Sequence, residues 1–141
     1  MSQLKRISNY ISQNTRNRIV FSDSIIDGLD FVDIGFCMAT ALTRNHDANP
    51  VDLVNKILEE SKVNPEIGNY LVIDNIGILF EPELKLDIRG LFDSYSKNQT
   101  LIVCSDATVA DGKFYFLSPE DKLFVNLDGL SFITINKRDK I

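Results

Sequence analysis

The sequence predicts an α/β protein with a mainly parallel central sheet, flanking helices and a C-terminal β extension. Three observations lead to this fold class. Residues 70–74 and 100–104 are almost entirely apolar, as are strands buried on both faces of a parallel sheet. The segment between them has apolar residues at helical spacing, which makes a strand–helix–strand crossover. After residue 112 the chain changes to short aromatic and β-branched runs separated by turns.

The first third of the chain is predicted to alternate helices with short strands. Residues 2–16 form a helix, because apolar residues recur there at the spacing of one helical face. Two strands follow, a buried one at 19–21 and a second at 29–34. The second strand leads into a helix over 35–43.

The later elements follow from caps, periodicity and turn residues. A helix over 50–61 begins at a proline, and an asparagine precedes it as the cap. Residues 62–69 are predicted to be a turn before the central strand. Another helix is expected over 82–97, because it also starts at a proline and has one apolar face. Beyond it, strands are expected at 114–117 and, as one or two more, within 124–135.

Composition limits the function classes. With 141 residues, 44% hydrophobic and 25% charged, the chain is expected to form one ordinary globular domain over 1–141. No apolar run is long enough to span a bilayer, and the N-terminal residues lack the apolar stretch of a secretion signal. Cys37 and Cys104 are isolated in apolar segments, as in proteins of a reducing compartment. We therefore expect a cytoplasmic protein without membrane contact and without a metal site.

Charge is distributed unevenly along the chain. The net charge of −5 argues against a general nucleic-acid binder, which would carry a basic surface. The N-terminal segment differs, because residues 1–18 contain Lys5, Arg6, Arg16 and Arg18 and no acid. Two interpretations stay open for this basic N-terminal helix, predicted as residues 1–17 of the domain. It is either a solvated helix face or a docking surface for an acidic partner or a phosphate backbone.

The strand end at Asp74 and Asn75 is the most informative motif. A buried strand that delivers one carboxylate at its C-terminal end is how nucleotide-hydrolysing sheets hold a magnesium-bound water. The next strand of the crossover ends on Ser105 and Asp106. Because ligands of open α/β sheets bind at the carboxyl ends of the strands, these four residues are the candidate nucleotide or metal ligands.

The phosphate-binding element that should accompany this motif is missing. A phosphate loop needs G-x-x-x-x-G-K-[ST], in which backbone N–H groups face the phosphates and the lysine neutralises them. The only Gly-Lys pair, Gly112-Lys113, is followed by Phe114 and has Ala107 at the place of the first glycine. After the first strand, residues 22–28 contain two acids, which would repel a triphosphate. The sequence therefore contains half of a nucleotide-hydrolysis signature.

Two segments carry a resemblance to a known family. Residues 70–87 read Y-L-V-I-D-N-I-G-I-L-F-E-P-E-L-K-L-D, and residues 91–103 read L-F-D-S-Y-S-K-N-Q-T-L-I-V. They resemble the Walker B half of the small P-loop-containing protein of type 3 bacteriophage-exclusion (BREX) loci, where an apolar strand ends in Asp-Asn before a Pro-containing turn. The tail 112–119 is similar to that protein's ending of a glycine, a short strand and a proline. The resemblance is good over 70–103 and loose over about 19–125.

The resemblance implies a P-loop NTPase-like sheet of the additional-strand type. It also implies a role in antiphage defence beside larger ATPase, methyltransferase and phosphatase-like subunits. By position, Asp74 matches the magnesium-orienting acid and Asn75 its neighbour, while Ser105 or Asp106 lies where a sensor residue could sit. The chain departs from the family at the phosphate loop, which has no counterpart between residues 21 and 31, and at the catalytic glutamate, which Asn75 replaces. Phosphoryl transfer depends mainly on positioning and charge neutralisation, so these losses imply a fold without catalysis.

We therefore expect a non-catalytic assembly or regulatory subunit of a BREX-like defence complex, with protein subunits as partners and no catalytic residue or cofactor. Self-association is a further expectation. The basic N-terminal residues and the aromatic Phe114 and Tyr115 are the expected interaction surfaces. One alternative is an ATPase-like subunit that binds Mg-ATP atypically, or completes a neighbour's site through Asp74 or Arg89. A second alternative is a nucleic-acid-binding accessory protein that uses the basic segment.

Overall fold

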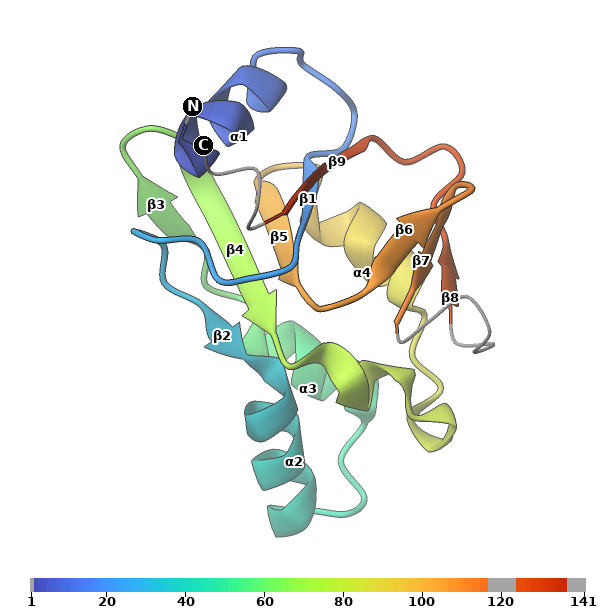
Figure 1. Ribbon diagram of the computed structural model, residues 1–141. Helices are drawn as coiled ribbons and strands as arrows, with labels where there is room; N and C mark the ends of the chain where they lie inside the picture. The colour runs from blue at the N-terminus through green and yellow to red at the C-terminus, as the bar shows by residue number, and fades with distance from the viewer. Residues whose placement is uncertain (1, 117–123, 137–141) are drawn as a thin grey trace.

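The computed structural model of the protein describes residues 2–116 and 124–136 (Figure 1). Its helices are α1 (Gln3–Ile11), α2 (Ile34–Arg44), α3 (Pro50–Ile57) and α4 (Ile88–Tyr95), with two 3-10 helices, η1 (Ile76–Phe80) and η2 (Pro82–Leu84). Its strands are β1 (Ile19–Ser22), β2 (Val32–Asp33), β3 (Lys62–Asn64), β4 (Gly68–Asp74), β5 (Thr100–Cys104), β6 (Thr108–Ala110), β7 (Lys113–Tyr115), β8 (Phe124–Asn126) and β9 (Phe132–Ile135).

The strands form two sheets. Five strands of the larger sheet run parallel in the order β2-β4-β5-β1-β9, and β3 pairs antiparallel with β4 beside β2. The smaller sheet is antiparallel in the order β6-β7-β8. The prediction of an α/β fold with a mainly parallel sheet and flanking helices is confirmed.

The central strands are buried on both faces, as their apolar runs predicted. Successive residues point to opposite faces of a strand, so each strand contributes to two cores. On one face, Val20, Val72 and Ile102 pack with Ile7 and Tyr10 of α1. The opposite face packs against α2, α3, α4 and the smaller sheet.

An aromatic cluster joins the smaller sheet to the larger one. The ring of Phe114 on β7 stacks on Phe21 of β1, with 4.8 Å between centroids, and meets Phe92 of α4 edge-on at 6.0 Å. Phe114 is only 1% exposed. Its prediction as an interaction residue is therefore wrong, because a core side chain offers no surface to a partner. Tyr115 is half-buried and packs against the exposed Phe124, with 5.8 Å between their ring centroids.

Two predicted helices are shorter than expected. The first ends at Ile11 instead of residue 16, because Ser12 is its C-cap and Asn14 adopts a left-handed conformation with φ 53°. The third, α3, is capped by Asn49 as predicted, since the Asn49 side chain accepts from the N–H of Asp52, but it ends at Ile57.

The helix predicted over 82–97 is divided in two. Pro82 starts only the short η2, which stops at Lys85 because that residue has φ 52°. The α-helix begins at Ile88, where the Asp87 side chain accepts a hydrogen bond from the N–H of Gly90 at 2.9 Å.

The predicted strands need four corrections. The strand expected over 29–34 is reduced to β2, because Asp33 already caps α2. The expected turn at 62–69 contains β3, which forms a hairpin with β4. The strand β6 was not predicted. β8 and β9 confirm two strands within 124–135, but β9 belongs to the larger sheet, so the C-terminal extension consists of β6, β7 and β8.

The predicted strand at 114–117 corresponds to β7. Residue 117 and the end of the 112–119 tail lie outside the described residues.

Candidate functional site

The carboxyl ends of the parallel strands meet at one edge of the larger sheet, where Asp74 is the last residue of β4. Asp74 is half-buried, and the register places it beside Asp33 at the end of β2. Within residues 2–116 and 124–136, the side chain of Asp74 forms no hydrogen bond or ion pair. The predicted acid is thus at the predicted edge, with a second carboxylate next to it.

Asn75 connects β4 to the start of α2. Its Nδ2 donates a hydrogen bond to Asp33 Oδ1 at 2.9 Å, and the same oxygen accepts from the N–H of Phe36 at 2.9 Å. Asn75 holds a left-handed backbone with φ 57°. Gly35 leaves room for it, since a Cβ there would lie 2.6 Å from the Asn75 carbonyl oxygen. The Asn75 side chain therefore helps to hold the cap of α2.

The hydrogen bonds around Asp33 also set its protonation. The N–H of Phe36, and then the Asn75 amide, lower the pKa of the Asp33 carboxyl below its ordinary value. On β5, burial and then the charge of Asp74 raise the pKa of the Cys104 thiol to about 12. Cys104 is therefore an unreactive core thiol, as its apolar surroundings predicted.

Ser105 lies in a different part of the same edge, near the end of β1. Its N–H donates to the carbonyl of Ser22 at 2.9 Å. A pocket of about 280 Å³ opens there between β1, β5, β6 and β9. Its lining residues are Phe21, Ser22, Asp23, Ser105, Ala107, Thr108, Val109, Phe114, Thr134 and Asn136. Asp74, Asn75 and the exposed Asp106 are not among them, so the structure separates the four predicted residues.

The chemistry of this pocket does not suit a triphosphate. Among the described residues, its lining has one carboxylate, that of Asp23, and no cationic side chain. Ser22 closes a tight turn, because its hydroxyl donates to the carbonyl of Ser24 at 2.5 Å and accepts from the N–H of Ser24 at 3.3 Å. All of residues 23–31 are described, and they contain no helix whose N-terminus could face a phosphate.

Metal ligands are too few at this edge. The described part of the chain contains no group of three or more His, Cys, Asp or Glu side chains placed to hold a metal ion. Asp33 and Asp74 are a pair to which the described residues add no third ligand of these types.

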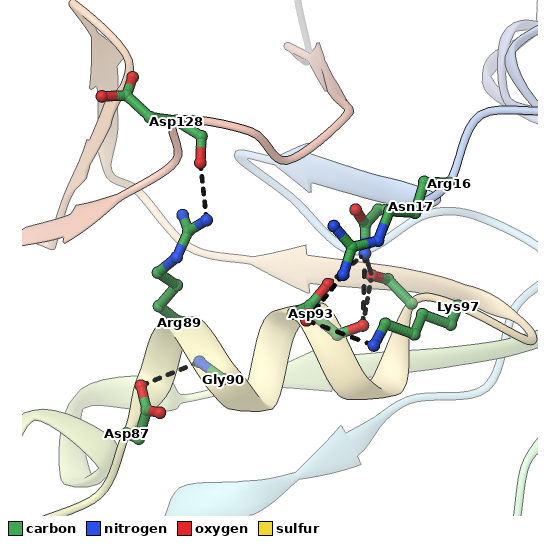
Figure 2. A network of polar contacts seen from close by, with 9 residues as sticks. Arg16, Asn17, Asp87, Arg89, Gly90, Asp93, Lys97 and Asp128 are labelled. Atoms are coloured by element: carbon green, nitrogen blue, oxygen red, sulfur yellow. Dashed lines mark hydrogen bonds and ion pairs between the residues drawn. The ribbon is translucent and has the colours of Figure 1, made fainter.

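Two of the four predicted basic side chains form polar contacts with other parts of the chain. Arg16 forms an ion pair with Asp93 at 3.7 Å (Figure 2), and Arg6 donates to the carbonyl of Thr134 at 3.4 Å. Lys5 is exposed on α1, and Arg18 is half-buried at the start of β1. The basic segment is therefore divided between α1 and the loop that follows it.

Arg89 of α4 is bound within its own chain. Its guanidinium donates to the carbonyls of Asn126 and Asp128, both at 2.6 Å, and Figure 2 shows the bond to Asp128. These bonds hold the turn after β8 against α4. The side chain is thus occupied and is a poor candidate for completing a neighbour's site.

Two residues with structural roles were not identified from the sequence. Asp33 was counted within a strand, although an aspartate before the apolar Ile34-Gly35-Phe36 is also a typical helix cap. Asn17 was not considered, and no local pattern points to it. It is fully buried, and its Nδ2 donates to Asp93 Oδ1 at 2.8 Å and to Ser96 Oγ at 3.0 Å.

Replacing Asn75 by glycine is expected to raise the pKa of Asp33 toward its ordinary value. Glycine keeps the left-handed backbone and removes only the amide that stabilises the carboxylate. A carboxyl with a lowered folded-state pKa stabilises the fold above its unfolded value of about 3.9 and loses that contribution as the pH falls through the folded value. The variant should therefore lose less stability between neutral and acidic pH.

A carbon-detected NMR titration of the aspartate carboxyls measures this shift. Asn98→Gly, at an exposed position, is the matched control and should leave the Asp33 titration unchanged. Identical Asp33 curves in wild type and Asn75→Gly would show that the amide does not act on this carboxyl.

Comparisons with protein-family models, with curated proteins and with solved structures found no match to this chain. Among the described residues, the helices are too short or too polar to cross a bilayer.

Proposed function

We propose that the chain is a non-catalytic assembly or regulatory subunit of a BREX-like antiphage defence complex. It acts through contacts with other protein subunits, on a degenerate P-loop-like sheet of the additional-strand type. The resemblance of residues 70–103 is the reason for naming this class of complex.

The order of the strands supports the P-loop-like part of the proposal. In an additional-strand sheet, one extra strand separates the strand before the phosphate loop from the strand that ends on the Walker B acid. Here β5 lies between β1 and β4, and β4 ends on Asp74. The crossover from β4 through α4 to β5 is the arrangement that this topology requires.

The path of the chain after β1 is the observation that carries the non-catalytic part. At the place of a phosphate loop, Ser22 closes a turn on Ser24, and the chain then reaches β2 without a helix. A phosphate loop supplies backbone donors, a lysine and a magnesium-binding hydroxyl together. One carboxylate on β4 replaces none of them, so the sheet is retained for contacts and not for hydrolysis.

A second candidate function is an ATPase-like subunit that binds nucleotide in an unusual way. One observation favours it: Asp74 and Asp33 are adjacent at the sheet edge, and no described residue forms an ion pair with either of them. A magnesium ion carried by a nucleotide would bridge such carboxylates without further protein ligands.

Isothermal titration of the full chain with Mg-ATP separates the two functions. We expect no heat of binding up to about 1 mM nucleotide, a limit that corresponds to about −4 kcal/mol. Micromolar binding that Asp74→Ala abolishes and Asp106→Ala preserves would establish the ATPase-like function instead. Asp106 is the matched control because it is an exposed acid at the end of the neighbouring strand.

Purification of the tagged chain from its native host tests the assembly function. We expect larger subunits of a defence locus to co-purify in a fixed ratio that persists in high salt. Recovery of the chain with no other protein would contradict the proposal.

A further inference from the structure

The outer face of α2 is a helix surface without charged side chains in its centre, and Phe36 is exposed on it. In Figure 1, α2 lies at the lower end of the molecule, far from α1. It packs against η1, α3 and β4, and its residues Ile34, Gly35 and Met38 are buried there. On the opposite side of the helix, Phe36, Ala39 and Thr43 are exposed in the described part of the chain.

This outer face has no charged side chain along its central turns. Phe36, which is 67% exposed, is followed at helical spacing by Ala39, Thr40 and Thr43. The hydroxyl of Thr43 donates to the carbonyl of Ala39 at 2.8 Å, so this polar group is satisfied inside the helix. The face can lose its water without leaving that group unpaired.

The two ends of α2 carry opposite charges. Asp33 caps the N-terminal end, and the exposed Arg44 is the last helical residue. The helix has 11 residues and is therefore about 16 Å long. A second copy lying antiparallel along this face would place Arg44 near the partner's Asp33, once at each end. The two helix dipoles would also lie antiparallel, which is a favourable arrangement.

We propose that the outer face of α2 is a self-association surface, on which two copies of the chain pack antiparallel about a two-fold axis. The axis passes near Ala39 and Thr40, whose small side chains let the helices approach closely. The charges favour a second copy of the chain as the partner, because the face is neutral in its centre and carries opposite charges at its two ends. The net charge of −5 makes two copies repel each other on average, so contact is favoured on a face whose centre is not charged.

The expected dimer is weak. One face of a three-turn helix offers less than the roughly 800 Å² per partner of a standard stable interface. We therefore expect a dissociation constant in the micromolar range. The inference goes beyond the proposed function, because the dimer forms with no other subunit present.

Sedimentation equilibrium of the full chain over a range of concentrations tests the proposal. The wild type should approach twice the monomer mass, and Phe36→Glu should stay monomeric at all concentrations. Val63→Glu is the matched control, since Val63 is 73% exposed on β3 and should leave the dimer intact. Circular dichroism verifies that both variants fold. A wild-type monomer up to about 1 mM, or a Phe36→Glu dimer as tight as the wild-type dimer, would overturn the inference.

Cysteine cross-linking tests the antiparallel arrangement. In a Cys37→Ser background, Thr40→Cys should form a disulfide-linked dimer under mild oxidation, because the axis brings the two copies of this position together. Val63→Cys should not cross-link, and the remaining Cys104 is buried. Efficient cross-linking at residue 63 and none at residue 40 would overturn the proposed surface. Either result leaves the co-purification test of the proposed function unaffected.

Discussion

Replacing Phe114 by alanine is expected to lower the free energy of unfolding by about 3–5 kcal/mol, the range measured for phenylalanine in a protein core. The ring is 1% exposed and lies between Phe21 and Phe92, where the smaller sheet meets the larger one. Alanine would leave a cavity at this seam between the two sheets. Urea denaturation followed by circular dichroism measures the loss.

The matched control for this variant is Phe124→Ala. Phe124 lies on the neighbouring strand of the same small sheet, but it is 46% exposed. Its replacement should cost less than about 1 kcal/mol, since little buried area is lost. Equal losses in the two variants would mean that the aromatic seam does not hold the sheets together.

Replacing Asn17 by alanine is expected to lower the free energy of unfolding by about 2–3 kcal/mol. The change removes one hydrogen-bond partner of the buried Ser96 hydroxyl, and it leaves a cavity where the amide group was. From the loop before β1, Asn17 donates hydrogen bonds to Asp93 of α4 and to Ser96, the C-cap of that helix; Figure 2 shows the network around Asp93. Its amide therefore joins the N-terminal segment to the end of α4. Asn98→Ala, at an exposed position after α4, should be close to neutral.

The same variant should change the titration of Asp93. The Asn17 amide is the main cause that lowers the pKa of Asp93, and Lys97 and Arg16 add to it. In the wild type this carboxylate stabilises the fold above its unfolded pKa and loses that effect as the pH falls through the lower folded value. Asn17→Ala should therefore raise the pKa of Asp93 and reduce the loss of stability in acid. An unchanged Asp93 titration would show that the ion pairs, and not the amide, hold the carboxylate.

The elements predicted correctly are those whose signals are local. The runs Tyr70–Asp74 and Thr100–Cys104 are apolar enough to require burial on both faces, and they are adjacent parallel strands. The cap at Asn49 was equally readable, because its geometry depends only on the next three residues. The position of Asp74 at the sheet edge follows directly from these signals.

The wrong boundaries arise where a backbone conformation overrides side-chain periodicity. Leu84 and Ile88 fit one helical face, yet Lys85 between them has a left-handed backbone that no helix permits. The sequence around Asp33 fits a strand and a helix cap equally well. In the structure the hydrogen bond from Asn75 holds the Asp33 side chain as the cap of α2. These outcomes depend on contacts between distant segments, which a single sequence does not reveal.

The separation of Ser105 from Asp74 has the same origin. Both residues follow apolar strands, so the sequence places them at one edge, but it does not say which strand lies beside β1. The pocket at Ser105 exists because β9 pairs with β1 and because the smaller sheet covers that side. Neither the pairing of β9 with β1 nor the position of the smaller sheet has a local signature in the sequence.

The pairing of β9 with β1 also affects how the chain folds while it is being synthesised. Ile19 is paired in register with Phe132, so two partners in one ladder are separated by almost the whole chain. While a ribosome is still translating the segment before residue 132, one side of β1 has no neighbour and its backbone groups stay exposed. Ladders of such high contact order close late and slowly. The nascent chain should therefore depend on chaperones until β9 emerges.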